Sequence, residues 1–75
     1  MLNSLYAIEN TNTRRKIVFS SFPLLWEAYQ KLYDKLFSVS YPGEQKMSEH
    51  TLKNALQVGG RITLGGGNWA IVHYH

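Results

Sequence analysis

The feature that most constrains this chain is the amphipathic stretch PLLWEAYQKLYDKLF at positions 23–37. Its apolar residues recur at spacings of three and four, the period of one face of an α-helix. They are Leu25, Trp26, Tyr29, Leu32, Tyr33, Leu36 and Phe37. Glu27 precedes Lys31 by four positions, the favourable order for a helical ion pair, and Lys31 and Lys35 are interpreted as solvated. The sequence therefore predicts one long helix whose apolar face packs against another layer.

Strand-forming residues precede this helix. The segments 5–9 and 16–22 are short and rich in β-branched and aromatic residues. Between them lies NTNTRR, in which Asn10 and Asn12 tolerate left-handed backbone angles. We expect a β-hairpin with a polar, basic tip.

Turn and capping residues mark where the first helix begins and ends. Ser20 or Ser21 is expected to cap its start, with Pro23 in the first turn. The segment SVSYPGEQK, 38–46, is predicted to be a loop in which Pro42-Gly43 occupies the centre of a type II turn.

A second, shorter helix is predicted to follow this loop. Ser48 is its expected N-cap, and Met47 and Leu52 have the spacing of a hydrophobic staple. Gly59 is expected to end the helix in a left-handed conformation.

The last fifteen residues, RITLGGGNWAIVHYH, contain three consecutive glycines. A phosphate-binding glycine loop needs a following helix whose free N–H groups converge on the anion. Here the glycines are followed by WAIVHYH, which alternates and is rich in strand formers. We therefore expect a hairpin, with strands at 61–64 and 69–74.

These elements predict a single α+β domain over residues 1–75, in the order β-β-α-α-β-β. We expect a four-stranded antiparallel sheet packed by the long helix and the shorter one. The alternative rests on SEHTLKNALQVGG and the hairpin after it, which resemble the recognition helix and wing of winged-helix proteins. That resemblance implies that a groove of nucleic acid faces Glu49, His50, Lys53, Asn54 and Gln57, with residues 65–68 as the wing.

Composition argues against several functions. With 75 residues and no cysteine, the chain offers neither a disulfide framework nor a thiolate zinc site. His73 and His75 share a strand face but lack an evident third ligand, and near the chain end they are interpreted as solvated. The five carboxylates are scattered. We expect no metal, no cofactor and no enzymatic activity, with a metal-free RNase that uses histidine and lysine as the remaining catalytic alternative.

Basic and aromatic residues mark the candidate contact surfaces. The net charge is +3 and favours anionic partners. Arg14, Arg15 and Lys16 cluster at the first hairpin, and Lys46, Lys53 and Arg61 surround the second helix. Tyr41, beside the Pro-Gly turn, is a candidate anchor for an interface. If the two basic groups share one side, they form a footprint for nucleic acid or for an acidic protein surface.

The sequence favours a non-enzymatic binding module that acts by protein–protein contact. In size and layout the chain resembles small proteins of phages and mobile elements, including inhibitors of CRISPR effectors and of restriction enzymes. That resemblance implies an inhibitor of a nucleic-acid-handling or nucleoprotein complex. The alternative is a winged-helix-like regulator that binds DNA or RNA directly. No apolar run is long enough to span a membrane, so we expect a cytoplasmic protein; a homodimer through a sheet edge is a further possibility.

Overall fold

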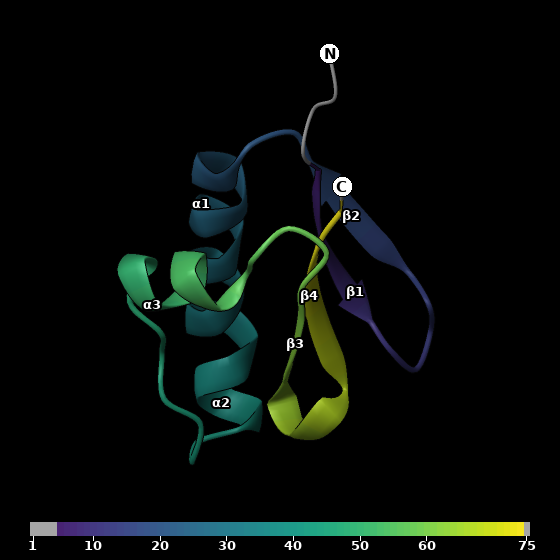
Figure 1. Cartoon of the computed structure of the whole chain (residues 1–75). Helices are drawn as coiled ribbons and strands as arrows, with labels where there is room; N and C mark the ends of the chain where they lie inside the picture. The colour runs from purple at the N-terminus through teal and green to yellow at the C-terminus, as the bar shows by residue number, and fades with distance from the viewer. Residues whose placement is uncertain (1–4, 75) are drawn as a thin grey trace.

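The computed structural model describes residues 5–74, which form a sheet and a helical layer (Figure 1). The strands are β1 (Tyr6–Asn10), β2 (Lys16–Phe19), β3 (Arg61–Leu64) and β4 (Trp69–His73). Their order in the antiparallel sheet is β2-β1-β4-β3. The predicted α+β fold, with four antiparallel strands and two helical segments, is confirmed.

The long helix covers one face of the sheet. It comprises α1 (Phe22–Leu32), a π-helical turn η1 (Tyr33–Phe37) and α2 (Ser38–Ser40). Ser21 is the N-cap residue, although its side chain makes no capping hydrogen bond. The prediction that residues 38–40 belong to a loop is wrong, because the helix continues through the π-helical turn to Ser40.

The predicted turn around Pro42-Gly43 exists but has a different type. The Glu44 N–H donates to the Tyr41 carbonyl at 3.0 Å, which closes a β-turn over residues 41–44. A type II turn requires a positive φ at its third residue, and Gly43 does not have one. The type II prediction is therefore wrong.

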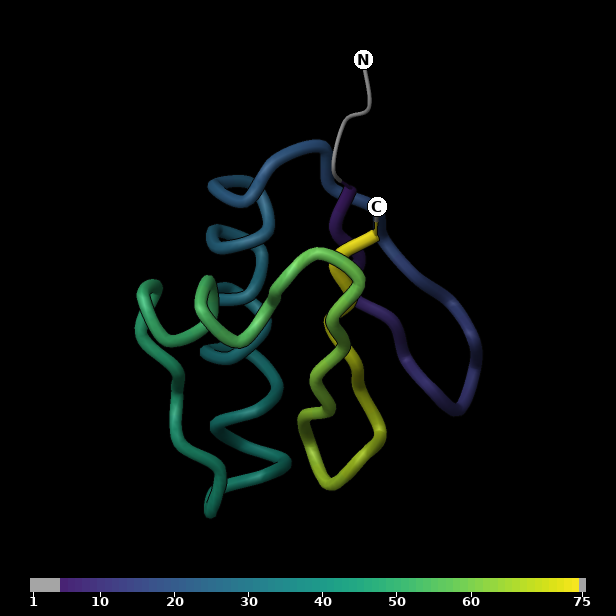
Figure 2. The backbone as a smooth tube through the Cα atoms, viewed as in Figure 1, coloured from purple at the N-terminus to yellow at the C-terminus, as the bar shows by residue number. Residues whose placement is uncertain are grey.

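The second helix, α3 (Glu49–Ala55), begins as expected. The Ser48 hydroxyl accepts a hydrogen bond from the Thr51 N–H at 3.2 Å, the bond of an N-cap residue. The helix ends at Ala55, so Gly59 does not stop it, although Gly59 has the expected positive φ of 80°. Figure 2 shows the connection in which Gly59 lies, leading from α3 directly into β3.

The first hairpin turns at a residue other than the predicted asparagines. The Asn10 side chain accepts hydrogen bonds from the N–H groups of Asn12 and Thr13, at 2.9 and 3.1 Å. Arg14 adopts the left-handed conformation, with φ 66°. Asn10 thus stabilises the turn through its side chain and keeps an extended backbone, which corrects the predicted role of Asn10 and Asn12.

The glycine run is a hairpin tip, as predicted, and it is held from two sides. Residues 65–67 form a short 3-10 turn between β3 and β4. The Gly65 N–H donates to both carboxylate oxygens of Glu44 at 2.9 Å. From the first hairpin, the Thr11 hydroxyl donates to the Gly67 carbonyl at 2.8 Å. The tip therefore joins the 41–44 turn to the first hairpin.

The core lies between the sheet and the helices. Register places Ile8, Ile17, Ile62 and Ile71 opposite one another across the four strands, on the face that the long helix covers. The buried cluster comprises Ile8, Phe22, Leu25, Tyr29, Phe37, Leu52, Leu56, Leu64 and Ile71. These residues come from both helices and from three strands, whereas Ile17 of β2 remains 66% exposed.

Among residues 5–74, no helix is both long and apolar enough to cross a membrane.

Candidate binding groove

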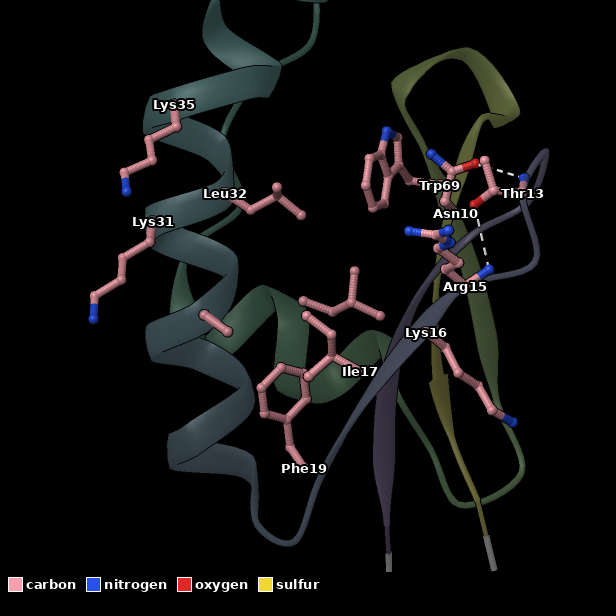
Figure 3. A pocket seen from close by; sticks show the side chains of 12 residues that line it. Asn10, Thr13, Arg15, Lys16, Ile17, Phe19, Lys31, Leu32, Lys35 and Trp69 are labelled. Carbon is pink, nitrogen blue, oxygen red and sulfur yellow. Dashed lines mark hydrogen bonds between the residues drawn. The ribbon is translucent and has the colours of Figure 1, made fainter.

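An open groove lies between β2 and the long helix (Figure 3). Its volume is about 830 Å³, and the first hairpin closes one end with Asn10 and Thr13. Its apolar lining comes from the sheet and from the helix: Ile8, Ile17, Phe19, Trp69, Ala28 and Leu32. Apolar groups of a partner that cover such a surface remove it from water, which favours binding.

The groove exists because the helical layer does not extend over the whole sheet. α1 packs against β1 and β2, but β2 is the edge strand and has only β1 as a neighbour. The Ile17 side chain lies on the helix-facing side, yet no described residue covers it fully. Val18, on the opposite face of the same strand, is 49% exposed. The edge strand thus exposes apolar side chains on both faces.

A second hollow continues the groove toward the start of α1. It shares Phe19, Ala28 and Lys31 with the first and adds Leu5, Val18, Ser20, Leu24 and Glu27. Leu24, Ala28 and Leu32 are four residues apart in turn, so they form one stripe along the helix. We name the two hollows together the β2–α1 groove. It runs along the length of β2.

The charge around the β2–α1 groove is mainly positive, with Glu27 in the smaller hollow as the one carboxylate among its lining residues. The lining of the larger hollow includes Arg15, Lys16, Lys31 and Lys35 and no carboxylate. Figure 3 shows the Arg15 guanidinium extending toward the helix, whereas the ammonium groups of Lys31 and Lys35 project outward from the helical rim. Lys31 forms a 3.1 Å ion pair with Glu27, but both side chains are well exposed, so this pair is weak.

The first predicted basic cluster divides between two surfaces. Arg14 and Arg15 lie exposed at the hairpin tip, where Arg15 borders the groove. The Lys16 ammonium is directed away from the groove, 5.3 Å from the centre of the Tyr74 ring and 3.3 Å from its hydroxyl. Lys16 therefore contributes charge mainly to the other face of the sheet.

The second predicted basic group already has intramolecular partners. Arg61 pairs with Glu9 at 3.4 Å. The ammonium groups of Lys46 and Lys53 lie about 6 Å from the aromatic rings of the long helix, at 6.0 Å from Tyr33 and 5.9 Å from Phe22. These contacts leave the positive charges at the surface and give each a favourable neighbour.

Tyr41 is half-buried and contacts other parts of the chain. Its ring is half-buried, with the Phe37 ring centre 5.9 Å away. Its hydroxyl accepts a hydrogen bond from the Asn68 side chain at 3.3 Å. The residue that sequence interpretation treats as a free anchor therefore fastens the 41–44 turn to the glycine tip.

The two basic groups do not form one footprint. In Figure 3, which looks into the groove, α3 lies behind the long helix and the strands. β2 and β3 are also opposite edges of the sheet. Arg15 is at the groove, whereas Lys53 belongs to α3 on the far side. An anionic partner therefore meets one group or the other.

The histidines do not form a metal site in the part of the chain that the structure describes. His73 is buried, its ring stacks on Tyr6 at 4.1 Å, and Nδ1 lies 2.9 Å from the Leu56 carbonyl. The interpretation of His73 as a solvated residue is wrong. His75 lies outside the described residues, and no group of three metal-ligating side chains occurs among residues 5–74.

Sequence interpretation misses the groove because the groove depends on which strand is at the edge. Periodicity places Lys31 and Lys35 on the solvated face of the helix. They border a groove only because β2, the strand beside the helix, is at the edge of the sheet. A signal does exist. Ile17, Val18 and Phe19 are consecutive, so in a strand their apolar side chains must point to both faces of the sheet.

Comparisons with protein families, with curated proteins and with solved structures return no match for this chain.

Proposed function

We propose that this chain is a non-enzymatic binding module whose β2–α1 groove receives an acidic segment, with apolar side chains, of a protein partner. One observation carries the proposal: an exposed apolar floor bordered by Arg15, Lys31 and Lys35 without a carboxylate in the larger hollow. Apolar burial supplies affinity, and the cations select acidic segments and accelerate their approach.

The groove chemistry supports a peptide-like occupant. Ile17 and Leu24 are 66% and 49% exposed, so a partner that covers them removes apolar surface from water. Arg15 is able to bind a carboxylate through two parallel hydrogen bonds. The floor is too apolar to favour a phosphate backbone, which requires cations along its path.

We also propose that the protein acts by binding alone: it covers a surface on a larger partner, such as a nucleic-acid-handling complex, and so inhibits it. Small size, the likeness in size and layout to inhibitors of that kind and the basic hairpin tip support this form of the proposal. It predicts that Arg14→Glu with Arg15→Glu weakens inhibition of such a complex and leaves thermal stability nearly unchanged. Unaltered inhibition would remove the tip from the interface.

The experiment that tests the groove is a selection from displayed random linear peptides with the purified protein as the target. The expected result is enrichment of peptides that combine acidic and apolar residues. Lys31→Glu with Lys35→Glu should abolish this enrichment. The matched control, Lys46→Glu with Lys53→Glu, makes the same change of charge away from the groove and should preserve it. Absence of enrichment, or equal loss in both variants, would contradict the proposal.

Direct nucleic-acid binding is a second candidate, favoured by the exposed side chains of α3. Glu49, His50, Lys53 and Asn54 are all exposed, as is Gln57 beyond the helix end. Fluorescence anisotropy with duplex DNA and single-stranded RNA at two salt concentrations tests it, because phosphate contacts weaken steeply as salt rises. Substitution of Lys53 or Arg61 should reduce that affinity. Salt-independent binding, or intact affinity in both variants, would argue against this candidate.

A further inference from the structure

We infer that the partner segment binds in extended form and adds a fifth strand to the free edge of β2, with alternate side chains in the β2–α1 groove. This inference rests on the proposed function and specifies how the segment is held. It follows from the hydrogen-bonding pattern of the edge, from the side chains on either side of it and from the charge around it.

The hydrogen-bonding pattern shows which backbone groups are available. The Asn10 N–H donates to the Arg15 carbonyl at 2.8 Å, so this pair is a hydrogen-bonded pair of the β1–β2 ladder. Such pairs alternate, which places Ile17 and Phe19 in hydrogen-bonded pairs with Ile8 and Tyr6.

The residues between them face the other way. Lys16 and Val18 direct their N–H and C=O groups outward, toward the edge where the sheet has no further strand. These groups form the hydrogen-bonding edge that a fifth strand needs.

The β2 edge differs from the β3 edge in what lies beside it. On β3 the helix-facing side chains are covered, with Leu64 7% exposed and Ile62 half-buried. On β2 the equivalent Ile17 is 66% exposed. Proteins usually protect an edge strand with proline, a bulge or a charged side chain such as lysine. Among these devices β2 has only the charge of Lys16 at its start, so the edge is open to pairing.

The side chains beside the edge specify the occupant. A strand next to β2 directs every second side chain toward Ile17 and the helical stripe of Leu24, Ala28 and Leu32. The intervening side chains lie on the opposite face, where Lys16 and Val18 project. The best complement is therefore a segment with apolar residues at alternate positions and acidic residues between and beside them.

Charge disfavours a second copy of this chain as the occupant. Pairing two β2 edges brings together two sets of Arg15, Lys16, Lys31 and Lys35 from chains that each carry a net charge of +3. An acidic segment from a different protein meets the same cations favourably.

The experiment removes one edge N–H and leaves the helix-facing side chains of β2 unchanged. Val18→Pro deletes the outward N–H of β2, and proline is tolerated at such an edge position because that group makes no ladder bond. The control Val18→Thr keeps the N–H and the branched side chain. The ligand is a peptide taken from the selection above. We expect Val18→Pro to lower its affinity about tenfold relative to Val18→Thr, because one hydrogen bond between β2 and the peptide strand is lost and the adjacent ones are weakened.

A second measurement leaves the protein unchanged. The selected peptide is methylated at one backbone nitrogen at a time, and affinity is expected to fall at alternate positions only. Equal affinity of Val18→Pro and Val18→Thr, with no alternation along the peptide, would overturn the strand inference. If Lys31→Glu with Lys35→Glu still abolished binding, the proposed groove function would survive that result. A homodimer that dissociates in Val18→Pro would also overturn the choice of occupant.

Discussion

Substitution of Gly65 by alanine should destabilise this protein far more than the same substitution at Gly67, two residues further along the glycine tip. Gly65 has φ 57°, and an added Cβ would lie 2.8 Å from Tyr41 Cε2, 3.0 Å from Tyr41 Cζ and 3.1 Å from Trp69 Cδ1. The Tyr41 ring packs near Phe37 and its hydroxyl is hydrogen-bonded, so it has little room to move. Gly67 has φ 90°, but nothing lies within 4 Å of its Cβ position.

The two costs follow from separate causes. A left-handed backbone costs an L-residue about 1–2 kcal/mol at either position. Overpacking adds about 1–3 kcal/mol at Gly65 alone. We therefore expect Gly65→Ala to lower the free energy of unfolding by about 3 kcal/mol, and Gly67→Ala by about 1.5 kcal/mol.

Urea unfolding followed by circular dichroism measures both values, with Gly43→Ala as a further control. Gly43 lacks a positive φ and has an empty Cβ position, so alanine there should be neutral or slightly stabilising. If Gly65→Ala cost no more than Gly67→Ala, the packing of Tyr41 against the glycine tip would be refuted.

Three further predictions concern the polar groups that hold the fold. Glu44→Ala removes the carboxylate bound to the Gly65 N–H and should cost about 1.5–3 kcal/mol in urea unfolding, whereas a cost near zero would contradict that bond. Burial raises the pKa of Tyr29 above its ordinary value of 10.0. The stability that the protonated Tyr29 hydroxyl contributes is therefore fully present below the unfolded-state pKa and is lost as pH rises through the folded-state pKa. Thermal melts should therefore show stability falling above about pH 10, with a shallower fall in Tyr29→Phe; identical slopes would count against it. His73→Leu leaves the Leu56 carbonyl without its imidazole partner and should lower stability by about 1–3 kcal/mol, and an unchanged melting temperature would contradict this hydrogen bond.

The fold was predictable from local patterns where these agree with tertiary structure. The apolar spacing over residues 23–37 indicates the helix, and the glycine run indicates a hairpin because strand formers follow it. Ser48 caps α3 because its side chain acts within one turn. Each of these signals involves residues that are close in sequence.

Other features depend on distant contacts that local patterns do not contain. The helix continues to Ser40 through a π-helical turn, whereas the loop-forming composition of 38–46 suggests an earlier end. The sequence suggests a free interface anchor at Tyr41 and a solvated His73, but these residues pack against partners far along the chain, Gly65 and Leu56. The groove itself requires knowledge that β2 is an edge strand.

The most direct test of the central claim is an amide chemical-shift titration of the isotopically labelled protein with a selected acidic peptide. If the partner segment pairs with β2 in the groove, the largest shifts will map to residues 16–19 and to the stripe of Leu24, Ala28 and Leu32. Amide exchange at Lys16 and Val18 will also slow on binding, because their N–H groups acquire acceptors. Shifts confined to α3 and the glycine tip, with residues 16–19 unaffected, would contradict the proposed groove.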